Sequence, residues 1–420
     1  MESKNGRMMR WGRTVGGVMA AAVLAVGTVW SAAGSMPQAH AAAGTGSPTF
    51  TDVKASHWAY SAVQQAVASG YVDGYINGTF KPEASVSRAE FVKMVVAAMK
   101  LDVADTPGKW YVRYADAATA KGLYEAGDFA NTEAAWNKTM TREEMARVAA
   151  RAVGETSKED DKWMYLATKG GLIQGVGKGQ LAPKGLTTRA QSVVIIDRIL
   201  KTNAGGKLES DRYATGAAEI LWHGTNIFTV MPEKFVTPES DWKNKGKSSI
   251  EEMWNEKNMT ITSKDGLYQG KLDALIAIDL DDKNDPNRGL LPLDKLKWFN
   301  GYGNFNEGVD LYINKEKGNY LLYFKGKPVF NKDPKRYLTQ NLLFFSVDAF
   351  DSPNETAMQN KNVLNGIAPV YQNDPSDTPM VIVPKTGTVQ RSDNITIQLV
   401  TPASGSLEVR TNLLSLRGTK

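Results

Sequence analysis

Three short segments in the first half of the chain share one pattern, and this repeat constrains the fold more than any other feature. They are S-R-A-E at 87–90, T-R-E-E at 141–144 and T-R-A-Q at 188–191, and each precedes an apolar run. A hydroxyl residue followed three positions later by glutamate or glutamine is a capping box, in which each side chain accepts a hydrogen bond from the other residue's backbone N–H. The pattern predicts three helix starts, capped by Ser87 with Glu90, Thr141 with Glu144 and Thr188 with Gln191.

A longer repeated unit surrounds these segments. Arg88 follows Gly74 by fourteen residues, and Arg189 follows Gly175 by the same interval. Upstream, Trp58 and Trp110 stand at matching places in the first two copies, whereas the third copy has glutamate there. The second copy has a connecting loop two residues longer than the others. Self-similarity at a fixed period predicts a helix–loop–helix unit that occurs three times.

The arginine in each segment is not explained by capping. A cation in the first helical turn faces the positive end of the helix dipole, which costs roughly 0.3–1 kcal/mol. We therefore expect each arginine to meet an anion. One alternative is an external carboxylate or phosphate, which a guanidinium and helix N–H groups bind well. The other is a salt bridge within the chain, for instance to Asp52, Asp73 or Asp116. The residues alone leave both open.

The first copy resembles an S-layer homology motif across nearly its whole length, residues 50–95. The resemblance is carried by the F-T-D-V opening at 50–53, H-W-A at 57–59, the loop G-Y-I-N-G-T-F-K-P at 74–82 and the S-R-A-E segment. The second and third copies match less closely, because the second lacks the G-T-F-x-P loop and the third lacks the tryptophan. Their order and spacing fit the triple array of this family, over about residues 48–202.

The resemblance implies a fold, a ligand and a set of site residues. Three such motifs form an all-α, three-pronged helical domain that binds the secondary polysaccharide of Gram-positive cell walls. The ligand is commonly a pyruvylated amino sugar whose carboxylate meets the arginine of the segment. Carried over by position, the ligand-binding residues are Arg88, Arg142, Arg189, Asp52, Trp58, Trp110, Gly74 and Gly175. For the two tryptophans, burial as core anchors of the first helix is the alternative.

The N-terminus predicts a cleaved signal peptide at 1–41. Four basic residues precede an apolar stretch from Val15 to Trp30, and Ala39-His40-Ala41 is an A-x-A cleavage signature. An uncleaved membrane anchor is the alternative. Residues 1–41 hold four of the 50 basic residues and one of the 45 acidic residues, so cleavage lowers the formal charge from +5 to about +2. This balance gives no bias toward nucleic acid, and we expect no membrane contact after cleavage.

Cofactor and metal chemistry is disfavoured by composition. The chain has no cysteine and three histidines, one of them within the signal peptide. We therefore expect no cofactor, no Cys/His metal site and no Cys–His catalytic pair. The acidic segment D-L-D-D-K-N-D at 279–285 is either a calcium loop or a plain acidic turn; lysine at its fifth position favours the turn.

The region after the repeats predicts a different fold. Short apolar runs separated by turn residues indicate a β-rich, sandwich-like module. The expected strands lie in 220–230, 258–263, 274–280, 309–314, 320–324, 341–350, 380–384, 395–400 and 407–416. We also expect a hairpin through K-E-K-G at 315–318 and one helix at 248–257. The aromatic loop W-F-N-G-Y-G-N-F-N-E-G at 298–308 either contacts sugar or packs its rings on the module, and burial statistics favour packing.

We expect a secreted protein, anchored non-covalently to the cell wall or S-layer, that displays the C-terminal module as a structural or ligand-binding part. The predicted organisation is a signal peptide at 1–41, copies at 42–100, 101–154 and 155–202, a linker at 203–212 and the module at 213–420. The alternative is a surface hydrolase in which the module is the catalyst. No pair of carboxylates has a spacing in the sequence that indicates a general acid and a general base, so no catalytic residue is predicted. Self-association is left open.

Overall fold

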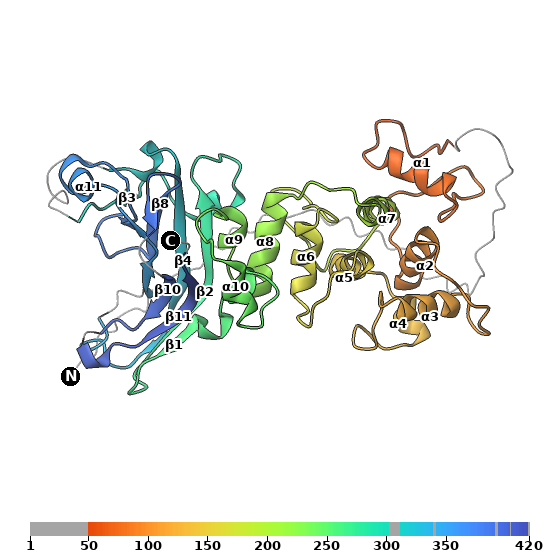
Figure 1. Ribbon diagram of the computed structural model, residues 1–420. Coiled ribbons are helices and arrows are strands. Elements are labelled where there is room, and N and C mark those ends of the chain that lie inside the picture. The colour runs from red at the N-terminus through yellow and green to blue at the C-terminus, as the bar shows by residue number, and fades with distance from the viewer. Residues whose placement is uncertain (1–48, 302–310, 339–341, 391–393, 404, 419–420) are drawn as a thin grey trace, which may run out of the picture. The chain divides into compact units, whose positions relative to one another are not determined.

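The computed structural model describes residues 49–301, 311–338, 342–390, 394–403 and 405–418. The predicted signal peptide lies outside these residues. Helices α1 to α10 precede the strands along the chain, and α11 lies among the strands (Figure 1). The helices of the repeat region are α1 (Tyr60–Ala68), α2 (Arg88–Ala98), α3 (Val112–Ala120), α4 (Glu133–Trp136), α5 (Arg142–Ala152), α6 (Lys162–Lys169) and α7 (Arg189–Asn203). No helix among the described residues has the length and apolar character that a membrane span needs.

One continuous hydrophobic cluster joins the repeat helices. The first two copies contribute a short alanine-rich helix, as Ala62 and Ala66 of α1 show, whereas α6 of the third copy buries larger side chains. The helix that follows the capping box supplies large apolar residues such as Phe91 and Val95 of α2, which is buried on most of its sides. Helix α8 (Arg212–His223) packs against α6 and adds Trp222 to the same cluster.

The expected strand at 220–230 is wrong. These residues form the end of α8 and the short helix α9 (Ile227–Val230). Asp211 caps the start of α8 by accepting hydrogen bonds from two backbone N–H groups. Gly224 ends the helix with φ +80°, a left-handed conformation that glycine adopts without strain. Asp211 lies outside the apolar run from which a strand was inferred, and Gly224 lies in the middle of that run.

The C-terminal region consists of antiparallel sheets. The six-stranded sheet has the order β1-β2-β4-β8-β7-β3, the three-stranded sheet β11-β10-β5, and β6 pairs with β9. The strands are β1 (Thr260–Thr262), β2 (Tyr268–Asp279), β3 (Lys297–Trp298), β4 (Asn319–Asn331), β5 (Phe344–Asp348), β6 (Phe350–Asp351), β7 (Ala368–Tyr371), β8 (Met380–Pro384), β9 (Val389–Gln390), β10 (Asn394–Val400) and β11 (Arg410–Arg417). Every pair of these strands that forms hydrogen bonds is antiparallel.

Both faces of the six-stranded sheet are buried. One face shares a cluster with the three-stranded sheet, where the rings of Phe324 and Phe345 stack with centroids 3.8 Å apart. The other face is covered by Trp298, Ile313 and Met358. Helix α11 (Glu355–Lys361) supplies Met358. Strand β8, the second half of β2 and the first half of β4 therefore carry apolar side chains on both faces, as their near-continuous burial shows.

Two further local expectations are wrong. The helix expected at 248–257 is replaced by two 3₁₀ turns, η1 (Glu251–Met253) and η2 (Glu256–Met259), because Trp254 between them is extended and buried. The expected hairpin does not form either. Ile313–Lys315 is a 3₁₀ turn, while β4 pairs with β2 and β8. A short helix α10 (Glu239–Lys243) precedes η1.

Candidate functional site

Each repeated segment begins a helix through a reciprocal capping box. Ser87 Oγ accepts the Glu90 backbone N–H at 3.2 Å, and the Glu90 carboxylate accepts the Ser87 N–H at 2.7 Å. The same pair of bonds joins Thr141 to Glu144 at the start of α5. It also joins Thr188 to Gln191 at the start of α7. Positions one and four of the segment are therefore accounted for by helix initiation.

The three helix starts contact one another in a closed ring. Isolated antiparallel bridges connect Ser87 to Thr139, Thr141 to Leu186, and Thr188 to Ser85. Copy one thus pairs with copy two, copy two with copy three, and copy three with copy one. Backbone hydrogen bonds reinforce each junction, such as Arg142 N–H to the Gly185 carbonyl at 2.8 Å. A ring of this kind brings each segment next to the loop of another copy.

The arginines follow the same cyclic rule. Arg88 donates to the carbonyl of Ala135 at 2.9 Å and to the Glu144 carboxylate, both in copy two. Arg142 donates to two carbonyls of copy three, Leu181 and Gln174, each at 2.9 Å. Arg189 donates to two carbonyls of copy one, Phe80 at 2.9 Å and Asp73 at 2.8 Å. Each guanidinium therefore holds the loop of the next copy.

The partners of the three arginines differ from the salt bridges that the sequence suggested as the intramolecular alternative. That alternative named the carboxylates of Asp52, Asp73 and Asp116. The structure instead uses backbone carbonyls at all three positions and one carboxylate, Glu144, beside Arg88. Carbonyl oxygens carry partial negative charge, so they also offset a cation in the first turn of a helix.

The three arginines differ in exposure. Arg88 and Arg142 are 6% and 5% exposed, and burial lowers the pKa of Arg142. Arg189 is half-buried and forms no ion pair among the described residues. Its guanidinium is the most accessible of the three, which leaves it the freest to meet an external anion.

Arg189 belongs to a small cationic and aromatic cluster with Tyr75 and Lys81. The Arg189 guanidinium carbon lies 5.2 Å from the centre of the Tyr75 ring, and the Lys81 ammonium lies 4.1 Å from it. The Tyr75 ring is 38% exposed. We call these three residues the Arg189 cluster. Sequence reasoning missed Tyr75 and Lys81, although both stand in the loop that carries the family resemblance.

Asp52 holds the loop that carries Lys81 of the Arg189 cluster. Its two carboxylate oxygens accept the backbone N–H groups of Phe80 and Lys81, each at 2.8 Å. Burial alone would raise the pKa of Asp52, but these hydrogen bonds and the charge of Arg189 lower it on balance. Asp52 thus fixes the loop that presents Lys81. Whether it also contacts ligand stays a prediction.

The two loop glycines serve close packing. A Cβ at Gly74 would lie 2.2 Å from the Phe50 ring, so no larger residue fits there without a shift. Gly175 donates its backbone N–H to Asp211 at 3.1 Å, and a Cβ there would meet that carboxylate at 3.3 Å. These contacts explain why glycine stands at both positions. Ligand binding by Gly74 or Gly175 stays a prediction.

The predicted tryptophans lie at the surface. Trp58 is 60% exposed and Trp110 is 45% exposed, so the core-anchor alternative is wrong for both. Core positions are taken instead by Trp136 in copy two and Trp163 in copy three, 1% and 4% exposed. Trp58 and Trp110 therefore have indole surface available for a ligand.

The other candidate sites are structural. Asp279 pairs with Lys385 at 2.5 Å and with Arg212 at 3.3 Å, so its charge is already compensated. No cluster of three metal-ligating side chains occurs among the described residues, and the choice between a calcium loop and an acidic turn at 279–285 stays a prediction. Trp298 is fully buried and donates its indole N–H to Glu316. Residues 302–308 of the aromatic loop lie outside the described residues.

Comparison with known proteins supplies the family. The family model of the S-layer homology domain matches residues 49–92 and 162–191, which hold the first copy and most of the third. The N-terminal part of this chain is an S-layer homology region. Such a region makes the protein a cell-surface or cell-wall protein, attached through that region. The prediction of a second copy at 101–154 continues to depend on its capping box and its place in the ring.

The chain is similar to part of each of three relatives. The chain is 32% identical to an exoglucanase, XynX, of Acetivibrio thermocellus over 37% of this chain and 16% of the relative. It is 30% identical to a surface-layer 125 kDa protein of Lysinibacillus sphaericus over 35% and 14%, respectively. It is 33% identical to a cellulosome-anchoring protein of Acetivibrio thermocellus over 18% and 19%. The chain matches less than a fifth of each of these relatives.

Proposed function

We propose that this protein is exported and held non-covalently on a Gram-positive cell wall by its S-layer homology region, which binds the secondary cell-wall polysaccharide. Three copies, at 42–100, 101–154 and 155–202, would form one three-pronged helical domain. Its main contact is the Arg189 cluster, at the junction of copies three and one. The observation that carries the proposal is the exposure of Arg189, because the other two segment arginines are buried.

The chemistry of the Arg189 cluster suits an acidic sugar. Lys81 and Arg189 bring two positive charges to one face, and hydrogen bonds between a guanidinium and a carboxylate are about twice as strong as neutral ones. Tyr75 offers a ring against which the apolar face of a pyranose can pack. A pyruvyl ketal places a carboxylate on such a ring, so a pyruvylated amino sugar would satisfy both features at once.

Arg88 and Arg142 take a different part in this proposal. Their guanidinium groups hold neighbouring copies together, so their grooves would bind through other groups. Trp58 and Trp110 supply exposed indole surface in copies one and two. Several weak contacts on one rigid domain raise the effective concentration of each, which allows firm non-covalent attachment.

Sedimentation with purified cell walls tests the proposal. The full-length chain is mixed with walls before and after chemical removal of the secondary polymer. We expect the protein to pellet with intact walls and to stay in solution with stripped walls. Equal binding to both would place the attachment on peptidoglycan and overturn the proposal.

The C-terminal module then faces outward as a structural or ligand-binding part. The exoglucanase among the relatives favours the alternative of an anchored polysaccharide hydrolase. Incubation of the same preparation with cellulose, xylan and starch, followed by a reducing-sugar assay, decides between them. Release of sugar above a heat-denatured control supports the hydrolase, and its absence favours display.

A further inference from the structure

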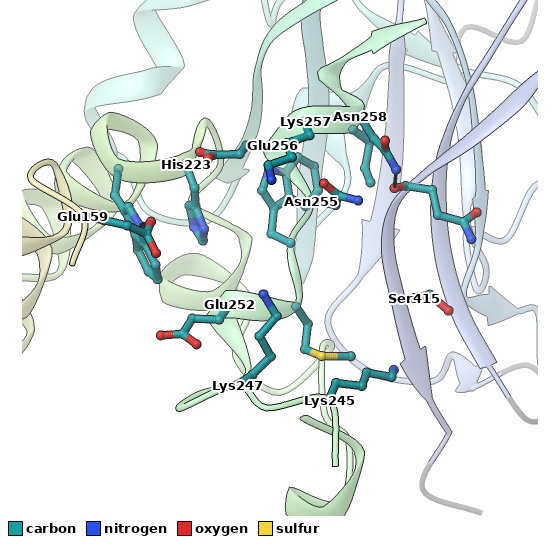
Figure 2. Close-up of a pocket in the computed structure, with 15 residues that line it drawn as sticks. Glu159, His223, Lys245, Lys247, Glu252, Asn255, Glu256, Lys257, Asn258 and Ser415 are labelled. Atoms are coloured by element: carbon teal, nitrogen blue, oxygen red, sulfur yellow. Dashed lines mark hydrogen bonds between the residues drawn. The ribbon is translucent and has the colours of Figure 1, made fainter. Parts of the chain in front are cut away.

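A polar hollow lies where α8 meets the C-terminal sheets. It encloses about 790 Å³, within the range of pockets that bind small ligands. Asn255, Glu256, Lys257 and Asn258 of the η2 segment lie along one side, and Lys245 and Lys247 lie on the other (Figure 2). His223 stands at one end and Ser415 of β11 at the opposite end. We call this site the α8–β11 hollow.

The walls of the hollow are fixed before any ligand binds. Asn255 donates its backbone N–H to the Leu413 carbonyl at 2.7 Å, and the Asn258 side chain donates to the Asn412 carbonyl at 2.7 Å. These bonds attach η2 to β11. At the other end, Trp222 Nε1 donates to Glu159 at 2.7 Å. A site whose lining is held by the fold needs little ordering when it binds.

Two buried polar atoms beside the hollow lack a partner in the described part of the chain. Trp254 is 5% exposed and lines the hollow, yet its indole N–H makes no hydrogen bond there. His223 is also 5% exposed, and its Nε2 lies 3.7 Å from Glu219, beyond hydrogen-bond distance. Buried donors are almost always paired in native structures, so an unpaired one needs an explanation. Both atoms are buried behind the lining and out of reach of a ligand in the open hollow, which must therefore bind through the exposed side chains of the lining.

The charges of the lining select the ligand class. Three lysines, 245, 247 and 257, are balanced by three glutamates, 159, 252 and 256. A balanced lining gives no net attraction for an acidic polymer or a nucleotide. It is rich in both donors and acceptors, which is what the hydroxyl groups of a sugar require, since each hydroxyl both donates and accepts. The face of Trp222 is already covered by His223, with ring centroids 4.1 Å apart, so recognition here would depend on hydrogen bonds.

We propose that the α8–β11 hollow binds a segment of a neutral oligosaccharide. This site is separate from the Arg189 cluster and does not depend on the wall-anchoring proposal. The protein would then carry two glycan sites of different chemistry, a cationic one on the S-layer homology region and a neutral one beside the C-terminal sheets.

Isothermal titration calorimetry on the full-length chain tests this inference. The probes are cellohexaose, maltohexaose, the hexamer of N-acetylglucosamine and, for comparison, hexagalacturonic acid. We expect at least one neutral probe to bind with a dissociation constant below about 1 mM, a free energy of about −4 kcal/mol. We expect the acidic probe to bind more weakly.

Variants then assign the binding to the hollow. Glu256→Ala removes an exposed carboxylate of the lining, and we expect it to weaken binding about three- to tenfold, the worth of one hydrogen bond. Lys257→Ala changes an exposed residue and should weaken binding without affecting the fold. Lys325→Ala, an exposed lysine on β4, should leave binding unchanged. No binding by any neutral probe, tighter binding of the acidic probe, or affinities of Glu256→Ala and Lys257→Ala equal to that of the unaltered chain would each overturn the inference.

Discussion

The guanidinium of Arg88 in copy one donates to Glu144, the residue that completes the capping box of copy two. One oxygen of the Glu144 carboxylate accepts from Arg88 while the other accepts the Thr141 backbone N–H at 3.0 Å. Two copies are thereby coupled through a single side chain. The equivalent residue of copy three is Gln191, which caps its own helix and has no arginine partner in the part of the chain that the structure describes.

This asymmetry predicts unequal effects of the same substitution. Glu144→Ala removes a cap and leaves Arg88 buried without its ion pair, so we expect a loss of about 3 kcal/mol of unfolding free energy. Gln191→Ala removes a cap alone and should cost about 1 kcal/mol. Urea denaturation followed by circular dichroism measures both. Equal losses would show that the Arg88–Glu144 pair contributes nothing beyond capping.

Glu251 predicts a loss of stability in acid. Burial alone would raise the pKa of this carboxyl, but Lys169, at 2.6 Å, and a network of hydrogen bonds lower it to about 2. A carboxyl with a lowered folded-state pKa stabilises the protein above its ordinary pKa of 4.5, and this is lost as the pH falls toward 2. At about 1.4 kcal/mol for each pH unit, the loss is about 3 kcal/mol. The Glu251→Gln variant should show a flatter stability curve in this window; an unchanged curve would contradict the assignment.

Replacing either surface tryptophan should weaken attachment to the cell wall without lowering the stability of the fold. Trp58→Ala and Trp110→Ala should change the unfolding free energy by less than about 0.5 kcal/mol, since both residues are largely exposed. Both should weaken attachment to purified walls. Trp136→Ala, at a fully buried position, is the matched control and should cost about 3–5 kcal/mol. Stable variants with unaltered wall attachment would exclude the two indoles from ligand binding.

A larger residue at position 74 should disturb the packing against Phe50. A methyl group at this position would overlap the Phe50 ring, so Gly74→Ala should cost about 1–3 kcal/mol through forced repacking. Gly127→Ala is the control, because nothing lies within 4 Å of its Cβ position and its φ is not positive. Thermal unfolding compares the two. A Gly74→Ala melting temperature equal to that of Gly127→Ala would show that Phe50 moves aside without cost.

Local signals in the sequence were sufficient for the helix starts. A capping box involves residues three apart, so S-R-A-E, T-R-E-E and T-R-A-Q could be interpreted directly. The partners of the arginines could not, because Arg189 contacts carbonyls more than a hundred residues away, at Asp73 and Phe80. Those contacts follow from the closure of the ring, which no local pattern encodes. The buried environment of Arg88 has the same origin.

The C-terminal module shows the same limit. Short apolar runs bounded by turn residues predicted strands such as β8 and β10, whose positions agree with the structure. The end of α8 was mistaken for a strand because helix α8 lies between two cores: Trp222 packs with the repeat helices, and Ile220 packs against the six-stranded sheet. The α8–β11 hollow combines residues from α8, η2 and β11, so no continuous segment of the sequence predicts it.

The most direct test of the central claim is the affinity of the Arg189→Ala variant for the purified secondary cell-wall polysaccharide. We predict at least tenfold weaker binding than the unaltered chain, about the worth of one charged hydrogen bond. The variant also loses the two bonds from Arg189 to the Phe80 and Asp73 carbonyls, so we expect a lowered unfolding transition in a protein that is still folded at the temperature of the assay. Lys121→Ala, which removes an exposed cation elsewhere in the repeat region, should bind as tightly as the unaltered chain. Undiminished binding by folded Arg189→Ala would contradict the account.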